Sequence, residues 1–138
     1  MRTIKFRARR KNGKWVVGNF INHFSTYFKT EERHSIFLPK PENDNGGYWV
    51  EDIDPETVGQ FTGLYDCDGK EIYEGDILRF GNSKCGVCEV KWDESIAAFC
   101  ILFYFEDEIG SRPLGGGVEF AIIGNINDNP ELLKGGEK

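Results

Sequence analysis

The stretch from Val58 to Phe80 joins short apolar segments through two tight turns, and it constrains the fold more than any other part of the chain. The first turn is the sequence DCDG at 66–69, and the second is EGD at 74–76. Glycine adopts positive φ at little cost, and aspartate side chains accept hydrogen bonds within their own turn. The spacing therefore predicts strand, turn, strand, turn, strand, which indicates a compact β module.

The N-terminal segment 3–21 carries the clearest local pattern. Apolar and basic residues alternate from Ile4 to Arg9, and Asn12-Gly13 precedes a second alternating run that begins at Trp15. Asn-Gly between two such runs is a strong hairpin signal, because both residues of a type I′ turn need positive φ. We therefore predict an N-terminal β-hairpin. Phe6 is expected in the core, with its basic neighbours on the opposite face.

Other elements follow from shorter signals. Strands are expected at 36–38, 88–92 and 118–126, a long polar loop at 106–117, and a disordered tail at 135–138. Asp54-Pro55 and Asn129-Pro130 each resemble a helix start, because a capping residue precedes a proline at the first helical position.

The longest apolar run is IAAFCILFYF at 96–105. A segment this apolar must lose water on both faces, so it is either a central strand or part of a contact between subunits. Its ten residues are about half of what crosses a bilayer, and the N-terminus lacks the apolar region of a secretory signal. We therefore expect no membrane association and a cytoplasmic protein.

Charge is distributed unevenly along the chain. Residues 1–14 carry seven of the 17 Lys and Arg and none of the 23 Asp and Glu, so the other residues carry a net charge of −13. Such a basic segment either contacts nucleic acid or lines an exposed strand and opposes edge-to-edge pairing. Because alternation turns Phe6 away from the cations, the basic face is expected to lack an aromatic platform. The candidate nucleic-acid contacts are Lys5, Arg7, Arg9, Arg10, Lys11 and Lys14.

The four cysteines are the first candidates for metal chemistry. Cys85 and Cys88 have ligand-like spacing, but a zinc site needs a second pair, and Cys67 and Cys100 are isolated. Residues three apart on a strand point to opposite faces. Reduced, partly buried thiols are therefore expected, with no metal and no cofactor.

No catalytic set is visible in the sequence. The DCDG turn resembles a calcium loop, but its glycine comes two residues early for an EF-hand. His23 and His34 lack an evident nucleophilic partner. One alternative remains, a divalent-metal hydrolase using Asp66, Asp68 and Asp76, although a tight turn explains these acids more simply.

Four segments resemble the YopX family, small proteins common in bacteriophages and prophages. They are IKFRAR at 4–9, QFTGLYD at 60–66, EIYEGDI at 71–77, and IGNI at 123–126 followed by DNPELL at 128–133. Arg9 stands where the family pattern has an aromatic. The resemblance spans nearly the whole chain. It implies a phage or prophage origin, an unassigned role, no transferable catalytic residues, and a small SH3-like barrel in the C-terminal part.

The predicted fold class is mainly β, with short helical turns and an N-terminal hairpin region packed on a small SH3-like barrel. One compact unit is expected, with the hairpin and an irregular region at 1–56 and the barrel-like module at 57–134. The predicted core residues are Phe6, Trp15, Phe61, Leu64, Ile72, Ile77, Leu78, Val90, Phe99, Ile101, Phe120, Ile122 and Ile126.

The leading functional hypothesis is a non-enzymatic phage accessory protein that acts as an interaction module in a host bacterium. Its partner would be a phage or host protein, or a second copy bound through the run 96–105. The alternative is a nucleic-acid-binding protein that uses the basic hairpin, and fold alone does not decide between them.

Overall fold

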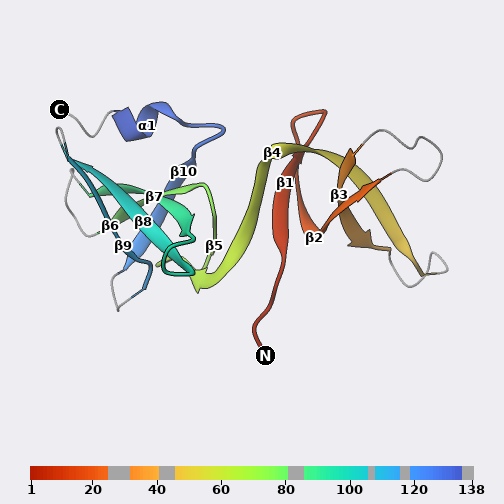
Figure 1. The fold of residues 1–138 in the computed structure, drawn as a ribbon, viewed down its shortest axis with the longest axis horizontal. Helices are drawn as coiled ribbons and strands as arrows, with labels where there is room; N and C mark the ends of the chain where they lie inside the picture. Colours follow the sequence, from red (N-terminus) through yellow and green to blue (C-terminus); the bar gives the residue numbers. More distant parts are fainter. Residues whose placement is uncertain (25–31, 41–45, 81–85, 106–107, 116–118, 135–138) are drawn as a thin grey trace. The chain divides into compact units, whose positions relative to one another are not determined.

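The structure is a computed structural model that describes residues 1–24, 32–40, 46–80, 86–105, 108–115 and 119–134. The fold is mainly β, with one short helix in the described part of the chain (Figure 1). The elements are β1 (Phe6–Arg10), β2 (Trp15–Phe24), β3 (Glu32–Pro39), β4 (Tyr48–Tyr65), β5 (Glu71–Tyr73), β6 (Asp76–Phe80), β7 (Val87–Asp93), β8 (Ala98–Phe105), β9 (Glu108–Pro113), β10 (Phe120–Asn125) and α1 (Glu131–Lys134).

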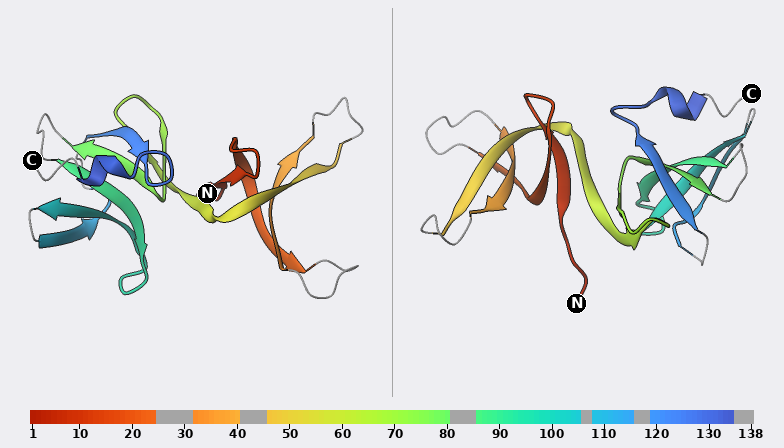
Figure 2. Two further views of the ribbon diagram at one scale, coloured as in Figure 1. Left: turned by 90° about the horizontal axis from the view of Figure 1, so that it is seen from above. Right: turned by 180° about the vertical axis from the view of Figure 1, so that it is seen from behind.

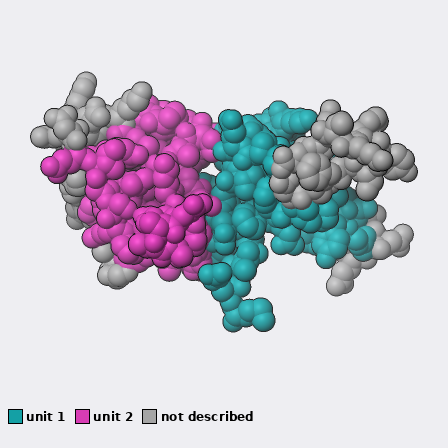
Figure 3. All heavy atoms as spheres, viewed as in Figure 1, with its two compact units in different colours: residues 1–61 teal, residues 62–138 magenta. Residues whose placement is uncertain are grey.

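The chain divides into two compact units, Met1–Phe61 and Thr62–Lys138, which are called unit 1 and unit 2 below (Figure 3). The long strand β4 contributes to both, since its residues 48–61 belong to unit 1 and its last four residues to unit 2. The expected boundary after residue 56 lies inside this strand. None of the helices in the described residues is long and apolar enough to cross a membrane.

Unit 1 is built from four strands whose pairings return to their starting point. β1 pairs with β2, β2 with β3, β3 with β4, and β4 with β1, all antiparallel. Figures 1 and 2 show the strong curvature of β4 that lets it pair with both β3 and β1. Alternate side chains point inward and form the buried core of Ala8, Val16, Ile36 and Ile53.

The predicted N-terminal hairpin is confirmed, but its turn differs from the expected one. The Gly13 N–H donates to the Arg10 carbonyl at 2.9 Å, and Gly13 has φ 87°. Asn12 does not have the positive φ that a type I′ turn requires. The loop is therefore the three-residue form, a type I turn followed by a glycine bulge, and it pairs Arg9 with Trp15.

The predicted helix start at Asp54-Pro55 is wrong, because these residues lie within β4. Here the register between β1 and β4 shifts, and the Arg9 N–H donates to Thr57 Oγ1 at 2.8 Å. Asp54 Oδ1 accepts from the Glu56 N–H at 3.1 Å, so the aspartate caps a bulge rather than a helix.

Unit 2 contains an antiparallel sheet with the strand order β10-β6-β7-β8-β9. The run 96–105 supplies β8, which lies between β7 and β9, as the central-strand alternative predicts. The loop expected at 106–117 is wrong for residues 108–113, which form β9. The side chains of β9 are mostly exposed. The sequence of this edge strand therefore does not alternate between apolar and polar residues, and alternation could not predict it. The SH3-like barrel is not confirmed and stays a prediction.

Most of the predicted core residues are buried in the structure. Phe61, the last residue of unit 1, is buried. The confirmed buried residues of unit 2 are Ile72, Ile77, Leu78, Val90, Ile101 and Phe120. Phe6, Trp15, Phe99, Ile122 and Ile126 are half-buried. Leu64 is exposed, which corrects its prediction: it lies three residues after buried Phe61, and residues three apart on a strand point to opposite faces.

The terminal helix α1 lies where it is predicted, but Asn129 holds it differently. The Asn129 carbonyl accepts from the Leu132 N–H at 3.1 Å, whereas its side-chain oxygen accepts from the Asn125 N–H at 3.3 Å. The tail 135–138 lies outside the described residues.

Candidate nucleic-acid interface

Trp15 lies on the same face of the hairpin as two arginines. The Arg7 guanidinium carbon is 5.0 Å from the centroid of the Trp15 ring, and the Arg9 guanidinium carbon is 5.1 Å from it. Arg9 is the cross-strand partner of Trp15, and Arg7 is its diagonal neighbour. The basic face therefore contains an aromatic ring, which corrects the prediction that it lacks one.

The type of hairpin turn explains why Trp15 lies on the basic face. A two-residue turn at Asn12-Gly13 would pair Arg10 with Trp15 and place the indole beside Ala8, in the core. The observed three-residue loop shifts the pairing by one residue, so Trp15 changes face. The one-residue difference moves an aromatic ring from the expected core to the cationic surface.

Three further candidate contacts, the lysines, lie on either side of these arginines in the sequence. Lys5 Nζ is 5.0 Å from the centroid of Phe61, which lies beside it on β4. Lys11 and Lys14 are exposed at the turn. Cations over aromatic faces are attracted by the ring quadrupole, which favours these positions.

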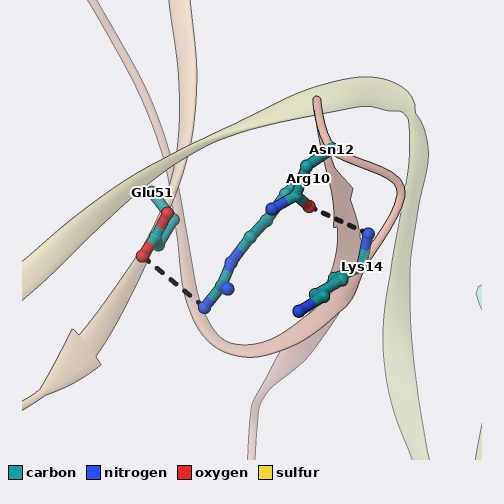
Figure 4. Close-up of polar contacts among 4 residues, drawn as sticks. All are labelled: Arg10, Asn12, Lys14 and Glu51. Carbon is teal, nitrogen blue, oxygen red and sulfur yellow. Dashed lines mark hydrogen bonds and ion pairs between the residues drawn. The ribbon is translucent and has the colours of Figure 1, made fainter.

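The hairpin turn is rigidified by its own polar contacts (Figure 4). The Lys14 N–H donates to Asn12 Oδ1 at 3.0 Å, and the Arg10 N–H donates to the Lys14 carbonyl at 2.8 Å. Arg10 Nη2 lies 3.5 Å from Glu51 Oε1 on β4. The Arg10 side chain thus forms an ion pair, whereas Lys11 and Lys14 are exposed residues.

Two open depressions flank this turn and share Arg10 and Lys11. The first has a volume of about 510 Å³, and its lining also includes Arg33 and Val50 together with the acids Glu51 and Asp52. The second, of about 550 Å³, lies against the β4 bulge at 53–55 and contains Arg9. The six candidate residues fall into two groups: Lys5, Arg7 and Arg9 each lie over an aromatic ring, and Arg10, Lys11 and Lys14 lie at the turn.

The acidic turn at 66–69 uses its carboxylate to hold the backbone. Asp66 Oδ1 accepts from the N–H groups of Asp68 and Lys70 at 2.9 and 2.8 Å, and Oδ2 accepts from the Ile122 N–H at 3.2 Å. Burial opposes ionisation, but the hydrogen bonds from Lys70, Ile122 and Asp68 dominate and lower the pKa of Asp66. This carboxylate joins the turn to β10.

The other two acids of the metal-hydrolase alternative do not converge on Asp66. Asp76 is 1% exposed, and its Oδ2 accepts from the Tyr73 N–H at 2.8 Å in the second turn. Asp68 is exposed. Among the described residues, no group of three His, Cys, Asp or Glu side chains is placed to hold a metal ion. These acids therefore serve the two turns that the sequence predicts.

Three cysteines lie in the described part of the chain, and all are free thiols. Cys88 is buried in the core of unit 2, and its thiol lies 3.6 Å from the Leu78 carbonyl oxygen. Burial raises the pKa of the Cys88 thiol to about 12, and the charge of Arg112 offsets this only partly. Cys85 lies outside the described residues.

Sequence reasoning missed the role of Trp15, although the turn carried a usable signal. Lys11-Asn12-Gly13 also fits a three-residue loop with glycine last, and that reading places Trp15 opposite Arg9. It missed Phe37 and Tyr48 on the neighbouring strands as well. Their ring centroids lie 6.4 Å apart, and Tyr48 is 61% exposed.

Comparison with known proteins identifies a family. A family model described as YopX protein matches residues 5–134. No curated protein matches the chain. The crystal structure of protein EF1440 from Enterococcus faecalis resembles it with a TM-score of 0.49 and 23% sequence identity, covering 96% of this chain and 99% of that one.

Proposed function

The chain belongs to the YopX family, and from this premise we propose that it is a non-enzymatic protein that binds nucleic acid through the basic face of unit 1. The observation that supports the proposal is the placement of both Arg7 and Arg9 over the ring of Trp15. A basic face without an aromatic ring would serve equally well to keep strand edges apart. Cations combined with an aromatic ring are typical of surfaces that bind single strands and nucleic-acid backbones.

The charge of the two units favours the same surface. Unit 1 carries ten Lys and Arg against eight Asp and Glu, whereas unit 2 carries seven against 15. The positive charge of unit 1 is further concentrated in its first 14 residues. Phosphate would therefore be attracted to the hairpin and repelled by unit 2. The phage or prophage origin and a location in the bacterial cytoplasm are part of this proposal.

Salt-dependent binding tests the proposal. Fluorescence anisotropy of a labelled 20-nucleotide single strand would be measured between about 50 and 200 mM NaCl, where phosphate contacts weaken steeply. Lys11→Ala/Lys14→Ala removes two exposed charges whose backbone contacts remain. We expect the slope of log K against log salt to fall in magnitude by about 1.4, because each phosphate contact contributes about 0.7 for single strands.

The matched control is Arg79→Ala/Lys91→Ala, which removes two exposed charges from unit 2. It should leave the slope unchanged. The proposal fails if the wild-type protein does not bind at low salt, or if the two double variants lose affinity equally.

The run 96–105 provides the second candidate function, homo-oligomerisation. Ile96 is 52% exposed and lies in the turn that precedes β8, beside Ala97 with φ 50°. In contrast, Cys100 and Ile101 are buried in the sheet. The proposed contact is therefore limited to the turn, and light scattering that reports a monomer for both the wild type and Ile96→Asp would reject it.

A further inference from the structure

We propose that the ligand of unit 1 is single-stranded nucleic acid, whose bases stack on an aromatic and apolar track continuous with the basic face. This inference rests on the proposed function and adds the form of the nucleic acid. The track is defined by strand register. Its members are Arg7, Arg9, Trp15, Val17, Asn19, Phe37, Tyr48 and Val50.

The register places these residues on one face. Arg7 pairs with Val17, and Asn19 lies two residues further along β2. Asn19 pairs with Phe37 on β3, and Phe37 pairs with Val50 on β4. Directly paired residues of antiparallel strands share a face, as do residues two apart on one strand. The face is therefore continuous from the hairpin to the start of β4.

Side chains of this face are exposed on β2, where Val17 pairs with Arg7, and at the start of β4. Tyr48 is 61% exposed, Val50 is 52% exposed and Val17 is 42% exposed. The opposite faces of these strands contribute to the core of unit 1 around Ile36 and Val16. The outward direction of the exposed side chains therefore follows from strand alternation, with the neighbouring residues directed into the core.

The distribution of side-chain types selects a single strand over a duplex. The cations lie on β1 beside Trp15 and Val17 of β2, and apolar and aromatic side chains continue the track across β3 and β4. A duplex presents phosphates outward and hides the faces of its bases, so it would leave Tyr48 and Val50 without a partner. A single strand presents both phosphates and unstacked bases, and every base has a face that can stack on an aromatic ring.

The dimensions suit a short segment. Trp15 and Asn19 are four residues apart on β2, or about 13 Å, and β2 and β4 are separated by two strand spacings, or about 10 Å. The diagonal of about 16 Å accepts about four or five bases at the stacked spacing of about 3.4 Å.

Asp52 lies on the same face beyond Val50 and accepts a hydrogen bond from Ser35 at 3.3 Å. Its charge repels phosphate and directs the backbone toward the arginines.

Tyr48→Ala tests the track, because it removes an exposed ring with little effect on the core. Anisotropy would be measured with a 20-nucleotide mixed-sequence single strand, its blunt duplex, and inorganic polyphosphate as a competitor. We expect the wild type to bind the single strand at least about tenfold more tightly than the duplex. Tyr48→Ala should weaken single-strand binding about five- to 100-fold, since one base stack contributes that much.

Two controls separate stacking from folding. Tyr48→Phe keeps the ring and should restore binding, and Tyr65→Ala removes a ring of similar exposure, 59%, from unit 2 and should change nothing. Equal binding of single strand and duplex, with Tyr48→Ala altering neither, would overturn the inference and leave the proposed function standing. Failure of all three polyanions to bind the wild type would overturn the proposed function itself.

Discussion

Replacement of Asp66 tests whether the acidic turn serves the fold or a metal ion. Its carboxylate is 8% exposed and accepts three backbone hydrogen bonds, from Asp68, Lys70 and Ile122. A hydrogen bond to a charged group stabilises by about 1.5–3 kcal/mol. Three such bonds would give at least about 4.5 kcal/mol, but water can hydrate the two turn N–H groups in Asp66→Ala, so we expect a smaller loss of about 3 kcal/mol. For a domain of the size of unit 2, which contains Asp66, that loss lowers Tm by at least about 12 °C.

Asp66→Asn separates charge from shape. The amide keeps one oxygen for the turn but directs its NH2 group toward the Ile122 N–H, so we expect an intermediate loss of about 1.5–2 kcal/mol.

The lowered pKa of Asp66 means that the stabilisation by its carboxylate is complete above the ordinary carboxyl value of 3.8. It is lost as pH falls through the lower pKa of the folded state. The stabilities of the wild type and Asp66→Asn should therefore converge in acid.

Urea denaturation of each variant, followed by circular dichroism at pH 7 and pH 3, measures these differences. Asp68→Asn is the matched control, because it changes an exposed carboxylate in the same turn and should cost less than about 0.5 kcal/mol. The reasoning is refuted if Asp66→Asn is as stable as the wild type at pH 7. It is also refuted if millimolar calcium stabilises the wild type but not Asp66→Asn, since the carboxylate would then bind a cation.

Two further predictions concern packing and thiol reactivity. Gly18→Ala should destabilise unit 1 by about 1–3 kcal/mol, because the added Cβ would meet the Phe37 carbonyl and lie 2.8 Å from Ile36 Cγ2. Thermal denaturation measures this, with Gly110→Ala, whose Cβ has its nearest neighbour at 3.7 Å, as the control. Iodoacetamide at pH 8 should modify exposed Cys67 in the native protein but reach buried Cys88 only after unfolding, as mass spectrometry of digested peptides would show. Native modification of Cys88 at the rate of Cys67 would contradict its burial.

Local signals predicted most of the strands of this fold because their chemistry is local. The turns at 66–69 and 74–76 depend on glycine conformation and on carboxylates that bind neighbouring N–H groups, and both lie where the sequence places them. The apolar run 96–105 likewise indicates a strand covered on both faces. Alternation within a strand also indicates which residues are buried, and it separates exposed Leu64 from buried Phe61, three residues earlier.

The features that escaped prediction depend on contacts between distant segments. Asp54-Pro55 has the sequence of a helix start, but pairing with β1 draws it into a bulge whose Thr57 hydroxyl binds the Arg9 N–H. Edge strand β9 has few apolar residues, so only its pairing with β8 reveals it. The position of Trp15 depends on a one-residue choice of turn type, and that choice determines whether the basic face carries an aromatic ring.

The most direct test of the account is a titration of the isotope-labelled protein with a short single strand, followed residue by residue through amide chemical shifts. We expect concentration-dependent changes at the hairpin from Arg7 to Trp15 and at Phe37 and Tyr48, with Val90 and Ile122 in unit 2 unchanged. Raising the salt concentration should reverse the changes at the hairpin. Shifts confined to unit 2, or no shifts at low salt, would contradict a nucleic-acid interface on unit 1.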